Sequence, residues 1–219
     1  MNEEFWPHRY YVKLVVLFIG VLMPLWLFGS LAEDVVEHDV FFFDRPILLF
    51  LHRNASPLLD SVMVFFSKSG SALVLIPFNV MVFAILMWRC NRAAASFWAL
   101  AVAGAALLNL LAKHAFARTR PALWISIFPE TTFSFPSGHA MQSMAVAAAL
   151  TLLAWPTHRR WGALLPATCF VFLVGISRVY LGVHYPSDIL AGWSASLVWV
   201  IGLSILFKER FARKERRNK

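Results

Sequence analysis

The feature that most limits how this chain can fold is a series of long apolar runs separated by short polar breaks. Of the 219 residues, 59% are hydrophobic and only 15% are charged, whereas about 25% are charged in a typical soluble domain. A soluble fold of this length has too little interior to bury so much apolar surface. Lipid can instead cover the outside of a helix bundle, because each helix satisfies its own backbone hydrogen bonds. We therefore predict an all-α, polytopic membrane protein.

Six of the apolar runs are predicted to cross the bilayer as helices. The six transmembrane helices are expected at about 14–32, 72–88, 94–116, 140–155, 161–181 and 189–207, in one integral-membrane domain over residues 1–219. Pro24 is expected to kink the first helix, which membrane helices tolerate. The patch Ala103-Gly104-Ala105-Ala106 favours close packing of the third helix.

The basic residues are placed unevenly along the chain. Thirteen of the twenty Lys and Arg residues lie in the N-terminal head, in the turns after the second and fourth helices, and in the basic tail 208–219. This positive-inside pattern predicts a plasma (bacterial inner) membrane protein with both termini in the cytoplasm. It also accounts for the net charge of +8 without nucleic acid, so we expect no nucleic-acid partner.

The connection 33–57 is the acidic part of the chain, and its apolar pieces are too short to span. We expect it to form an interfacial helix or to pack over the bundle. Its His38 and His52 show no metal-ligand spacing. Cys90 and Cys169 show neither metal spacing nor a disulfide framework.

Polar residues interrupt the apolar pattern at the ends of the third to sixth helices that face the periplasm or cell exterior. Lys113 and Arg120 lie seven residues apart, and Pro121 biases Arg120 out of the helix and into the loop. Interfacial snorkelling explains Arg118 well. It explains Lys113 less well, because this side should be poor in positive charge.

A small polar turn, Pro136-Ser137-Gly138-His139, precedes the fourth helix. Ser137 is a good N-cap, and the helix N-terminus beside it offers unpaired N–H groups to an anion. Gly138 would let that anion approach the backbone closely. His139 falls in the first turn, although a plain capping turn with an incidental histidine would look the same.

A second polar group, Ser177-Arg178 followed by His184 and Asp188, lies between the fifth and sixth helices. Pro186 suits the first turn of the sixth helix. Asp188 then comes close enough to accept a hydrogen bond from one ring nitrogen of His184, which leaves the other nitrogen free as nucleophile or base. A capping Asp beside a surface His would have the same sequence.

These groups converge on one membrane face. Three cations, two histidines, one carboxylate and a helix N-terminus are suited to a polyanion of tetrahedral size, and phosphate is the obvious candidate. One carboxylate and no cysteine ligand make a catalytic metal unexpected, so we predict no cofactor.

The pattern resembles the type-2 phosphatidic acid phosphatase superfamily, membrane lipid phosphatases related to bacterial non-specific acid phosphatases and vanadium haloperoxidases. The family pattern is K-x6-R-P, then P-S-G-H, then S-R-x5-H-x3-D. It is matched in order and spacing by Lys113 to Pro121, Pro136 to His139 and Ser177 to Asp188. From Lys113 to Asp188 the match spans about a third of the chain. The residues within the second and third patterns, Pro-Ser-Gly-His and Ser-Arg-Val-Tyr-Leu-Gly-Val-His, resemble those of enzymes of the phosphatidylglycerophosphatase B type. Some undecaprenyl pyrophosphatase-type relatives carry Asp where this chain has Gly138.

The resemblance implies an acid-phosphatase/haloperoxidase-like core and a role for each matched residue. His184 would attack phosphorus to form a phosphohistidine, Asp188 would orient it, and His139 would protonate the leaving oxygen. The phosphoryl oxygens would be held by Lys113, Arg120, Ser137, Gly138 and Arg178. The implied substrate is a lipid phosphate or pyrophosphate, such as phosphatidylglycerophosphate, undecaprenyl pyrophosphate or phosphatidic acid.

Two other functions remain open from the sequence. A lipid phosphotransferase would use the same His184 but pass the phosphoryl group to a lipid acceptor. A non-catalytic transporter or lipid-binding protein would use only the cations, and it would have no need of the His184–Asp188 pair. The expected partners are the bilayer and the lipid substrate, with no obligate protein partner evident.

Overall fold

The structure is a computed structural model that describes residues 11, 14–15, 17–38, 41–155 and 160–217, without the side chains of residues 160 and 208–217. The described part is all helical and contains no strand. In chain order its elements are the π-helical turn η1 (Phe18–Leu22) and the helices α2 (Met23–Val36), α3 (Asp44–Arg53), α4 (Pro57–Ser69), α5 (Ala72–Trp88), α6 (Arg92–Phe116), α7 (Gly138–Ala154), α8 (Arg160–Tyr180) and α9 (Pro186–Arg217). The predicted fold class is thereby confirmed.

The helix ends follow from local signals in the sequence. Ser56 caps α4, since its hydroxyl accepts a hydrogen bond from Leu59 N at 3.4 Å, and Pro57 follows at the first helical position. Asn91 caps α6 in the same way, and that helix ends at Phe116, where the next residue, Ala117, has a left-handed φ of 45°. Pro24 is the second residue of α2, next to the π-helical turn η1, so its missing N–H falls in the first turn of that helix and not in its middle.

Each predicted span is a helix, but six spans of full length are not found. Four helices of the described chain are long and apolar enough to cross a membrane: Phe18–Val36, Arg92–Phe116, Trp161–Tyr180 and Pro186–Phe207. Helices α4 and α5 together make a fifth candidate, bent by 44° at the break near Gly70. The fourth predicted span, 140–155, is α7, an apolar helix that is only 17 residues long. The basic turn 156–159 and most of the N-terminal head lie outside the described residues.

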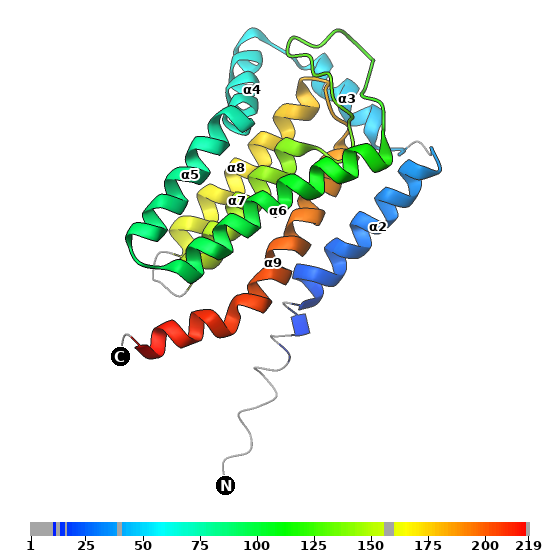
Figure 1. Cartoon of the computed structure of the whole chain (residues 1–219). Coiled ribbons are helices and arrows are strands. Elements are labelled where there is room, and N and C mark those ends of the chain that lie inside the picture. Colours follow the sequence, from blue (N-terminus) through cyan, green and yellow to red (C-terminus); the bar gives the residue numbers. More distant parts are fainter. Residues whose placement is uncertain (1–10, 12–13, 16, 39–40, 156–159, 218–219) are drawn as a thin grey trace.

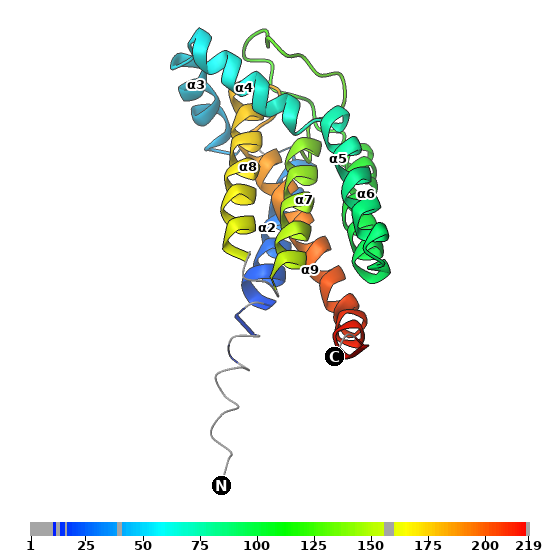
Figure 2. The same ribbon diagram turned by 90° about the vertical axis from the view of Figure 1, so that its left-hand side faces the viewer.

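Helix α7 lies in the middle of the bundle and packs against α6, α8 and α9 (Figures 1 and 2). The core between α6, α7 and α9 includes Trp98, Ala101, Ala145 and Val200. A Cβ added at Gly104 would lie 2.3 Å from the Trp199 ring of α9. The absence of a side chain at Gly104 therefore lets α6 and α9 pack closely, as predicted. Figure 2 shows α5 and α6 side by side, apart from α8 and α2.

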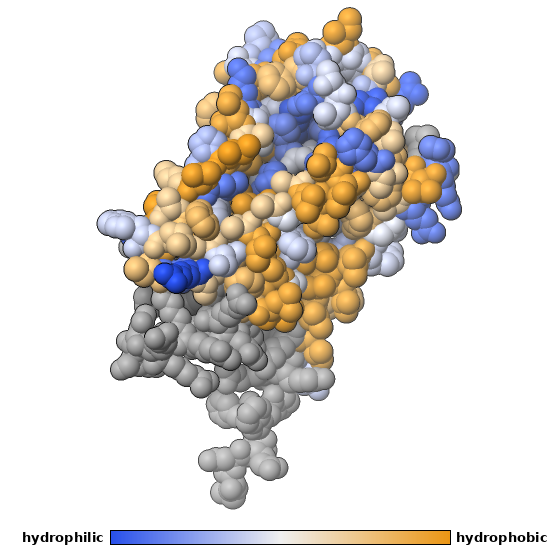
Figure 3. All heavy atoms as spheres, viewed as in Figure 1, coloured by the Kyte–Doolittle hydropathy of each residue, from blue (hydrophilic) through white to orange (hydrophobic). Residues whose placement is uncertain are grey.

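The connection 117–137 covers one end of the bundle together with α3 and α4, as Figure 1 shows. Its last part is fixed by Phe135, which is fully buried and packs on Phe28 of α2 and Phe116 of α6, with ring centroids 6.1 and 5.0 Å away. In Figure 3 hydrophilic side chains gather round a hollow at this end, whereas hydrophobic side chains cover much of the flank below. The apolar flank and the apolar helices make this an integral membrane protein.

Candidate active site

A cavity of about 370 Å³ opens below the connection 117–137, between α5, α6 and α7. Among the residues that line it are four of the predicted site residues with polar side chains: Lys113, Arg120, His139 and His184. The rest of its lining includes Gly138, Glu130, Thr132 and the amides Asn79, Asn109 and Gln142. The fold therefore brings Lys113 and His184, which are 71 residues apart in the sequence, to the same cavity.

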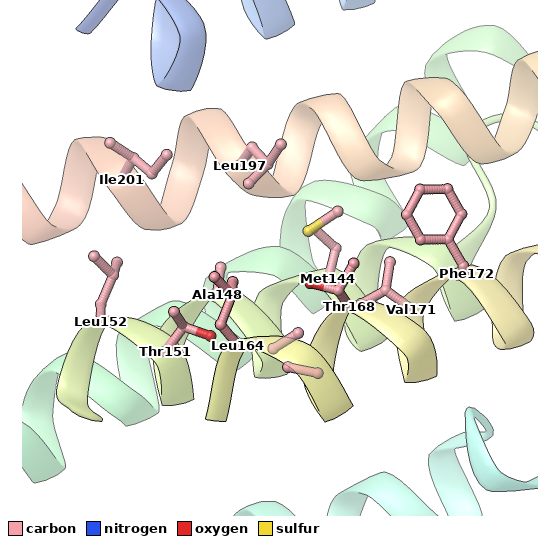
Figure 4. Close-up of a pocket in the computed structure, with 12 residues that line it drawn as sticks. Met144, Ala148, Thr151, Leu152, Leu164, Thr168, Val171, Phe172, Leu197 and Ile201 are labelled. Atoms are coloured by element: carbon pink, nitrogen blue, oxygen red, sulfur yellow. The ribbon is translucent and has the colours of Figure 1, made fainter. Parts of the chain in front are cut away.

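A second cavity, of about 310 Å³, lies between α7, α8 and α9 and differs in character (Figure 4). Its lining consists of apolar residues such as Met144, Leu164 and Phe172, with the hydroxyls of Thr151 and Thr168. Because no titratable side chain lines it, we place the chemistry in the first cavity.

His184 is held from both sides of its ring. Its Nδ1 lies 3.3 Å from Asp188 Oδ2, and its Nε2 lies 3.1 Å from Arg120 Nη1. Arg120 can only donate hydrogen bonds, so Nε2 carries a lone pair and Nδ1 carries the proton that faces Asp188. The predicted His184–Asp188 hydrogen-bond geometry is present, and the ring nitrogen with the free lone pair faces Arg120.

The environment of His184 also favours its neutral form. Burial lowers the pKa of His184 to about 3, although Asp188 acts in the opposite direction. A neutral imidazole keeps its lone pair, and nucleophilic attack requires that lone pair.

This low pKa can be tested directly. In detergent-solubilised protein with ¹⁵N-labelled histidine, we expect the His184 resonances to remain those of a neutral ring from pH 8 down to pH 5. At pH 5 a pKa of about 3 leaves about 1% of the ring protonated, whereas a histidine with the ordinary pKa of about 6.5 is mostly protonated there. The signal missing from His184→Gln protein gives the assignment. A titration midpoint near pH 6.5 would contradict the prediction.

Two cations tie the loop to the cavity wall. Lys113 Nζ donates to Thr132 Oγ1 at 2.9 Å and to the Phe133 carbonyl at 2.5 Å. Arg120 Nε donates to the Thr132 carbonyl at 2.6 Å, and its Nη1 donates to the Val183 carbonyl at 2.6 Å. As predicted, Arg120 lies in the loop rather than in α6, and it joins this loop to the segment that carries His184.

Arg178 of α8 is fully buried and already holds an anionic partner. It donates to Ser67 of α4, and its Nη2 lies 2.5 Å from Glu130 Oε1 in the loop. Glu130 also lines the cavity. Its carboxylate therefore pairs with the same guanidinium, that of Arg178, which the family resemblance assigns to binding a phosphoryl oxygen. A phosphate bound at Arg178 would compete with the Glu130 carboxylate for the charge of this guanidinium.

The variant Glu130→Gln is therefore expected to bind a phosphate-like anion more tightly. Removing the competing charge should lower the inhibition constant of vanadate about 3- to 10-fold, which corresponds to roughly 1 kcal/mol. The matched control is Glu37→Gln, which changes an exposed carboxylate at the end of α2. Equal or weaker vanadate binding by Glu130→Gln would mean that Glu130 orders Arg178 rather than competes at it.

His139 has an unused hydrogen-bonding atom at the cavity. Its Nε2 is buried without a hydrogen-bond partner among the described residues, and the same holds for Arg178 Nε. Buried polar atoms are normally paired, because an unpaired one costs about 1–3 kcal/mol. Two orphaned groups near one cavity are consistent with a ligand oxygen that completes them.

The turn before α7 has the predicted shape. Ser137 Oγ accepts a hydrogen bond from Ala140 N at 3.4 Å, so its hydroxyl caps α7 and does not line the cavity. Gly138 lines the cavity, and a Cβ there would lie 2.9 Å from Asn109 Oδ1. The glycine therefore also makes room for Asn109, whose amide donates to the Pro136 carbonyl at 3.0 Å.

The interpretation of Arg118 as a snorkelling residue is wrong. Its side chain is only 15% exposed and forms ion pairs with Asp188 at 2.6 Å and with Asp44 at 3.0 Å. The expectation of a single carboxylate at the site is also wrong, since Asp44 and Glu130 reach it from segments distant in sequence.

Ser134 is a further residue that the sequence reasoning missed. Its hydroxyl donates to Asp188 Oδ2 at 2.5 Å and lies 3.3 Å from His184 Nδ1. Ser134 lies outside each of the three matched patterns. The only feature of the sequence that could have pointed to it is its position two residues before Pro136.

The model of the PAP2 superfamily matches residues 94–212, more than half of the chain. The chain belongs to the PAP2 superfamily. Its PAP2 relatives include the undecaprenyl-diphosphatase of Sulfolobus acidocaldarius, 31% identical over 201 residues that make up 90% of each chain. Phosphatidylglycerophosphatase B of Bacillus subtilis is 31% identical over 65% of this chain and 72% of its own. Both relatives are named as phosphatases.

A solved PAP2 structure confirms the fold. The crystal structure of a transmembrane PAP2-type phosphatidylglycerolphosphate phosphatase from Bacillus subtilis superposes with a TM-score of 0.72. The superposition covers 85% of this chain and 96% of that one, at 27% identity.

Within the described residues no group of three or more His, Cys, Asp or Glu side chains is arranged to hold a metal ion. Metal independence itself stays a prediction.

Proposed function

We propose that this PAP2 protein is a lipid phosphatase that works through a phosphohistidine on His184 and needs no metal. The single observation that carries the proposal is the arrangement at the cavity. A neutral His184, oriented by Asp188, shares a cavity with His139 and with cations in a membrane-embedded bundle. Covalent catalysis needs a nucleophile, an orienting group and an acid, and these residues can supply all three.

The first step would transfer the phosphoryl group to the enzyme. The Nε2 lone pair of His184 attacks phosphorus, and the bond from phosphorus to the lipid oxygen breaks with its electron pair. That oxygen takes a proton from His139 and leaves as the dephosphorylated lipid. The proton on His184 Nδ1 stays directed at Asp188, which stabilises the positive charge that develops on the ring.

The second step would return the enzyme to its starting state. Water attacks phosphorus and gives a proton to His139, and the bond from phosphorus to Nε2 breaks with its electron pair returning to the ring. Inorganic phosphate leaves, with His184 neutral and His139 protonated again. Lys113, Arg120 and Arg178 would hold the phosphoryl oxygens in both steps, with the backbone N–H of Gly138 completing the cradle. The Ser137 N–H donates to the Asp188 carbonyl at 3.1 Å, so the role that the family resemblance gives Ser137 reduces to capping α7 and fixing the start of α9.

The substrate is proposed to be a membrane lipid phosphate or diphosphate. This follows from the membrane setting of the cavity and from the relatives, which are named for undecaprenyl diphosphate and phosphatidylglycerophosphate. We further propose one integral-membrane domain over 1–219, with both termini cytoplasmic and the cavity facing the periplasm or cell exterior. The turn with Arg89 and Arg92 supports this orientation, since it lies at the end of the bundle away from the 117–137 connection (Figure 1).

A headgroup panel on purified protein tests the function. Phosphatidylglycerophosphate, phosphatidic acid, undecaprenyl pyrophosphate and lipid A phosphate are each supplied with and without EDTA, and phosphate release is measured. We expect turnover of at least one lipid and no effect of EDTA. Loss of activity with the chelator alone would overturn metal independence, whereas ³²P found in an acceptor lipid instead of free phosphate would identify a phosphotransferase.

A further inference from the structure

Asp44 is a buried carboxylate that comes from outside the part of the chain matched by the PAP2 family model. It is the first residue of α3 in the acidic 33–57 connection, and it is 2% exposed. Burial raises the pKa of Asp44, while its hydrogen bonds with Ser187 and Arg118 lower it. A carboxylate is buried at such cost only where its charge is paired and its oxygens are hydrogen-bonded. The partners of Asp44 therefore indicate what it does.

Both oxygens of Asp44 are used at the start of α9. Asp44 Oδ1 accepts a hydrogen bond from the Ser187 backbone N–H at 2.9 Å. Oδ2 accepts from Ser187 Oγ at 2.5 Å and from Arg118 Nη2 at 3.0 Å. Ser187 directly precedes Asp188, so these bonds fix the helix turn that carries the His184 partner.

Arg118 continues the chain of contacts from Asp44 to Asp188. Its Nη1 donates to Asp188 Oδ1 at 2.6 Å and lies 2.8 Å from Ser187 Oγ. The guanidinium is stacked 4.2 Å from the Tyr185 ring, which restricts it further. One guanidinium thus bridges two carboxylates, and Asp44 offsets the positive charge that would otherwise act on Asp188 alone.

The bridge determines which oxygen of Asp188 is available to His184. Arg118 takes Oδ1, while Oδ2 accepts from Ser134 Oγ at 2.5 Å and Tyr185 N at 2.9 Å and lies 3.3 Å from His184 Nδ1. Rotation of the carboxylate would break all of these contacts together. The orientation of the imidazole, and with it the nitrogen that faces the cavity, depends on this arrangement.

We propose that Asp44 is a positioning residue, which acts through Arg118 and Ser187 to hold Asp188 Oδ2 against Nδ1 of His184. Helix α3 would then be part of the catalytic apparatus and not only a cover on the bundle. The inference rests on the proposed function in one respect, namely that His184 is the nucleophile.

The test is the variant Asp44→Asn, which keeps the size of the side chain and removes its charge. The matched control is Asp60→Asn, because Asp60 likewise joins two helices, α4 and α8, through a hydrogen bond from Tyr180 at 2.6 Å, but does not touch the His184 network. We expect Asp44→Asn to lower kcat about 10- to 100-fold with KM changed less than about threefold. Asp60→Asn should keep kcat within about twofold. Asp44→Glu should recover part of the lost kcat.

A second readout separates positioning from a purely structural role. The His184 ¹⁵N signals should shift or broaden in Asp44→Asn protein and stay unchanged in Asp60→Asn protein. If Asp44→Asn does not fold, Ser187→Ala, which removes the hydroxyl contacts with Asp44 and Arg118 but keeps the charges of both, should lower kcat in the same direction by a smaller factor. Equal kcat in the Asp44 and Asp60 variants, or an unchanged His184 spectrum, would overturn the inference.

The same series includes His184→Ala, so the two proposals can fail separately. An inactive His184→Ala protein together with a normal Asp44→Asn protein would refute only the positioning role. An active His184→Ala protein would refute the proposed function itself.

Discussion

Replacement of His184 with alanine is expected to lower kcat for every lipid phosphate by at least about 10⁴-fold, because the variant lacks the Asp188-oriented ring nitrogen that is proposed to form the covalent intermediate. Rapid acid-free quenching of wild-type protein mixed with ³²P-labelled substrate should trap label on the protein, and the variant should trap none. The decrease in kcat should be the same for substrates with different leaving groups, because the variant cannot carry out the first step with any of them.

The control for this variant is His114→Ala, at an exposed histidine on α6 that contacts only the edge of Phe133 among the ring pairs described. It should retain wild-type turnover and remain labelled in the quench experiment. Label on His184→Ala protein, or its turnover at more than about a hundredth of the wild-type rate, would show that the nucleophile lies elsewhere.

His139→Gln is expected to show a different kind of loss. A general acid contributes about 10²- to 10⁴-fold to the rate, and it contributes most when the leaving oxygen is strongly basic. Turnover of an alkyl lipid phosphate should therefore fall by this factor, whereas p-nitrophenyl phosphate, whose leaving group needs no proton, should lose far less. The ratio of the two rates is the measurement, and it is insensitive to the fraction of folded protein.

The two histidine variants together assign the roles. If His139→Gln reduced turnover of both substrates equally, His139 would act in binding or in the hydrolysis of the phosphohistidine, not as the acid for the leaving group. Accumulation of ³²P-labelled His139→Gln protein would then identify the second step as the one that has slowed.

Much of the fold could be predicted because a membrane chain carries strong local signals. The limits of α5 match the apolar run 72–88, and Pro186 and Ser137 mark helix starts by their own chemistry. The number of six full-length spans is not confirmed, since hydropathy shows that a run is apolar but not how long its helix is, and α5 and α7 are each only 17 residues long.

The site was predicted only where its residues lie in short, ordered patterns. His184 and Asp188 are four residues apart, so their pairing follows from one helical turn. Asp44 is 74 residues from Arg118, and no local pattern shows that they meet. A charge at a membrane interface is commonly a snorkelling side chain, and this general tendency led to the wrong interpretation of Arg118.

The buried bridge from Asp44 to Asp188 also has a consequence for biogenesis. Asp44 is synthesised early, and Arg118 lies in the middle of the chain. His184 and Asp188 come only at the start of α9. A nascent chain that has inserted every helix up to α8 therefore carries the cationic cradle but has neither nucleophile nor orienting carboxylate. The proposed nucleophile and its partner are therefore absent until synthesis has passed Asp188, so a product that stops before α9 would leave the lipids of the surrounding membrane untouched.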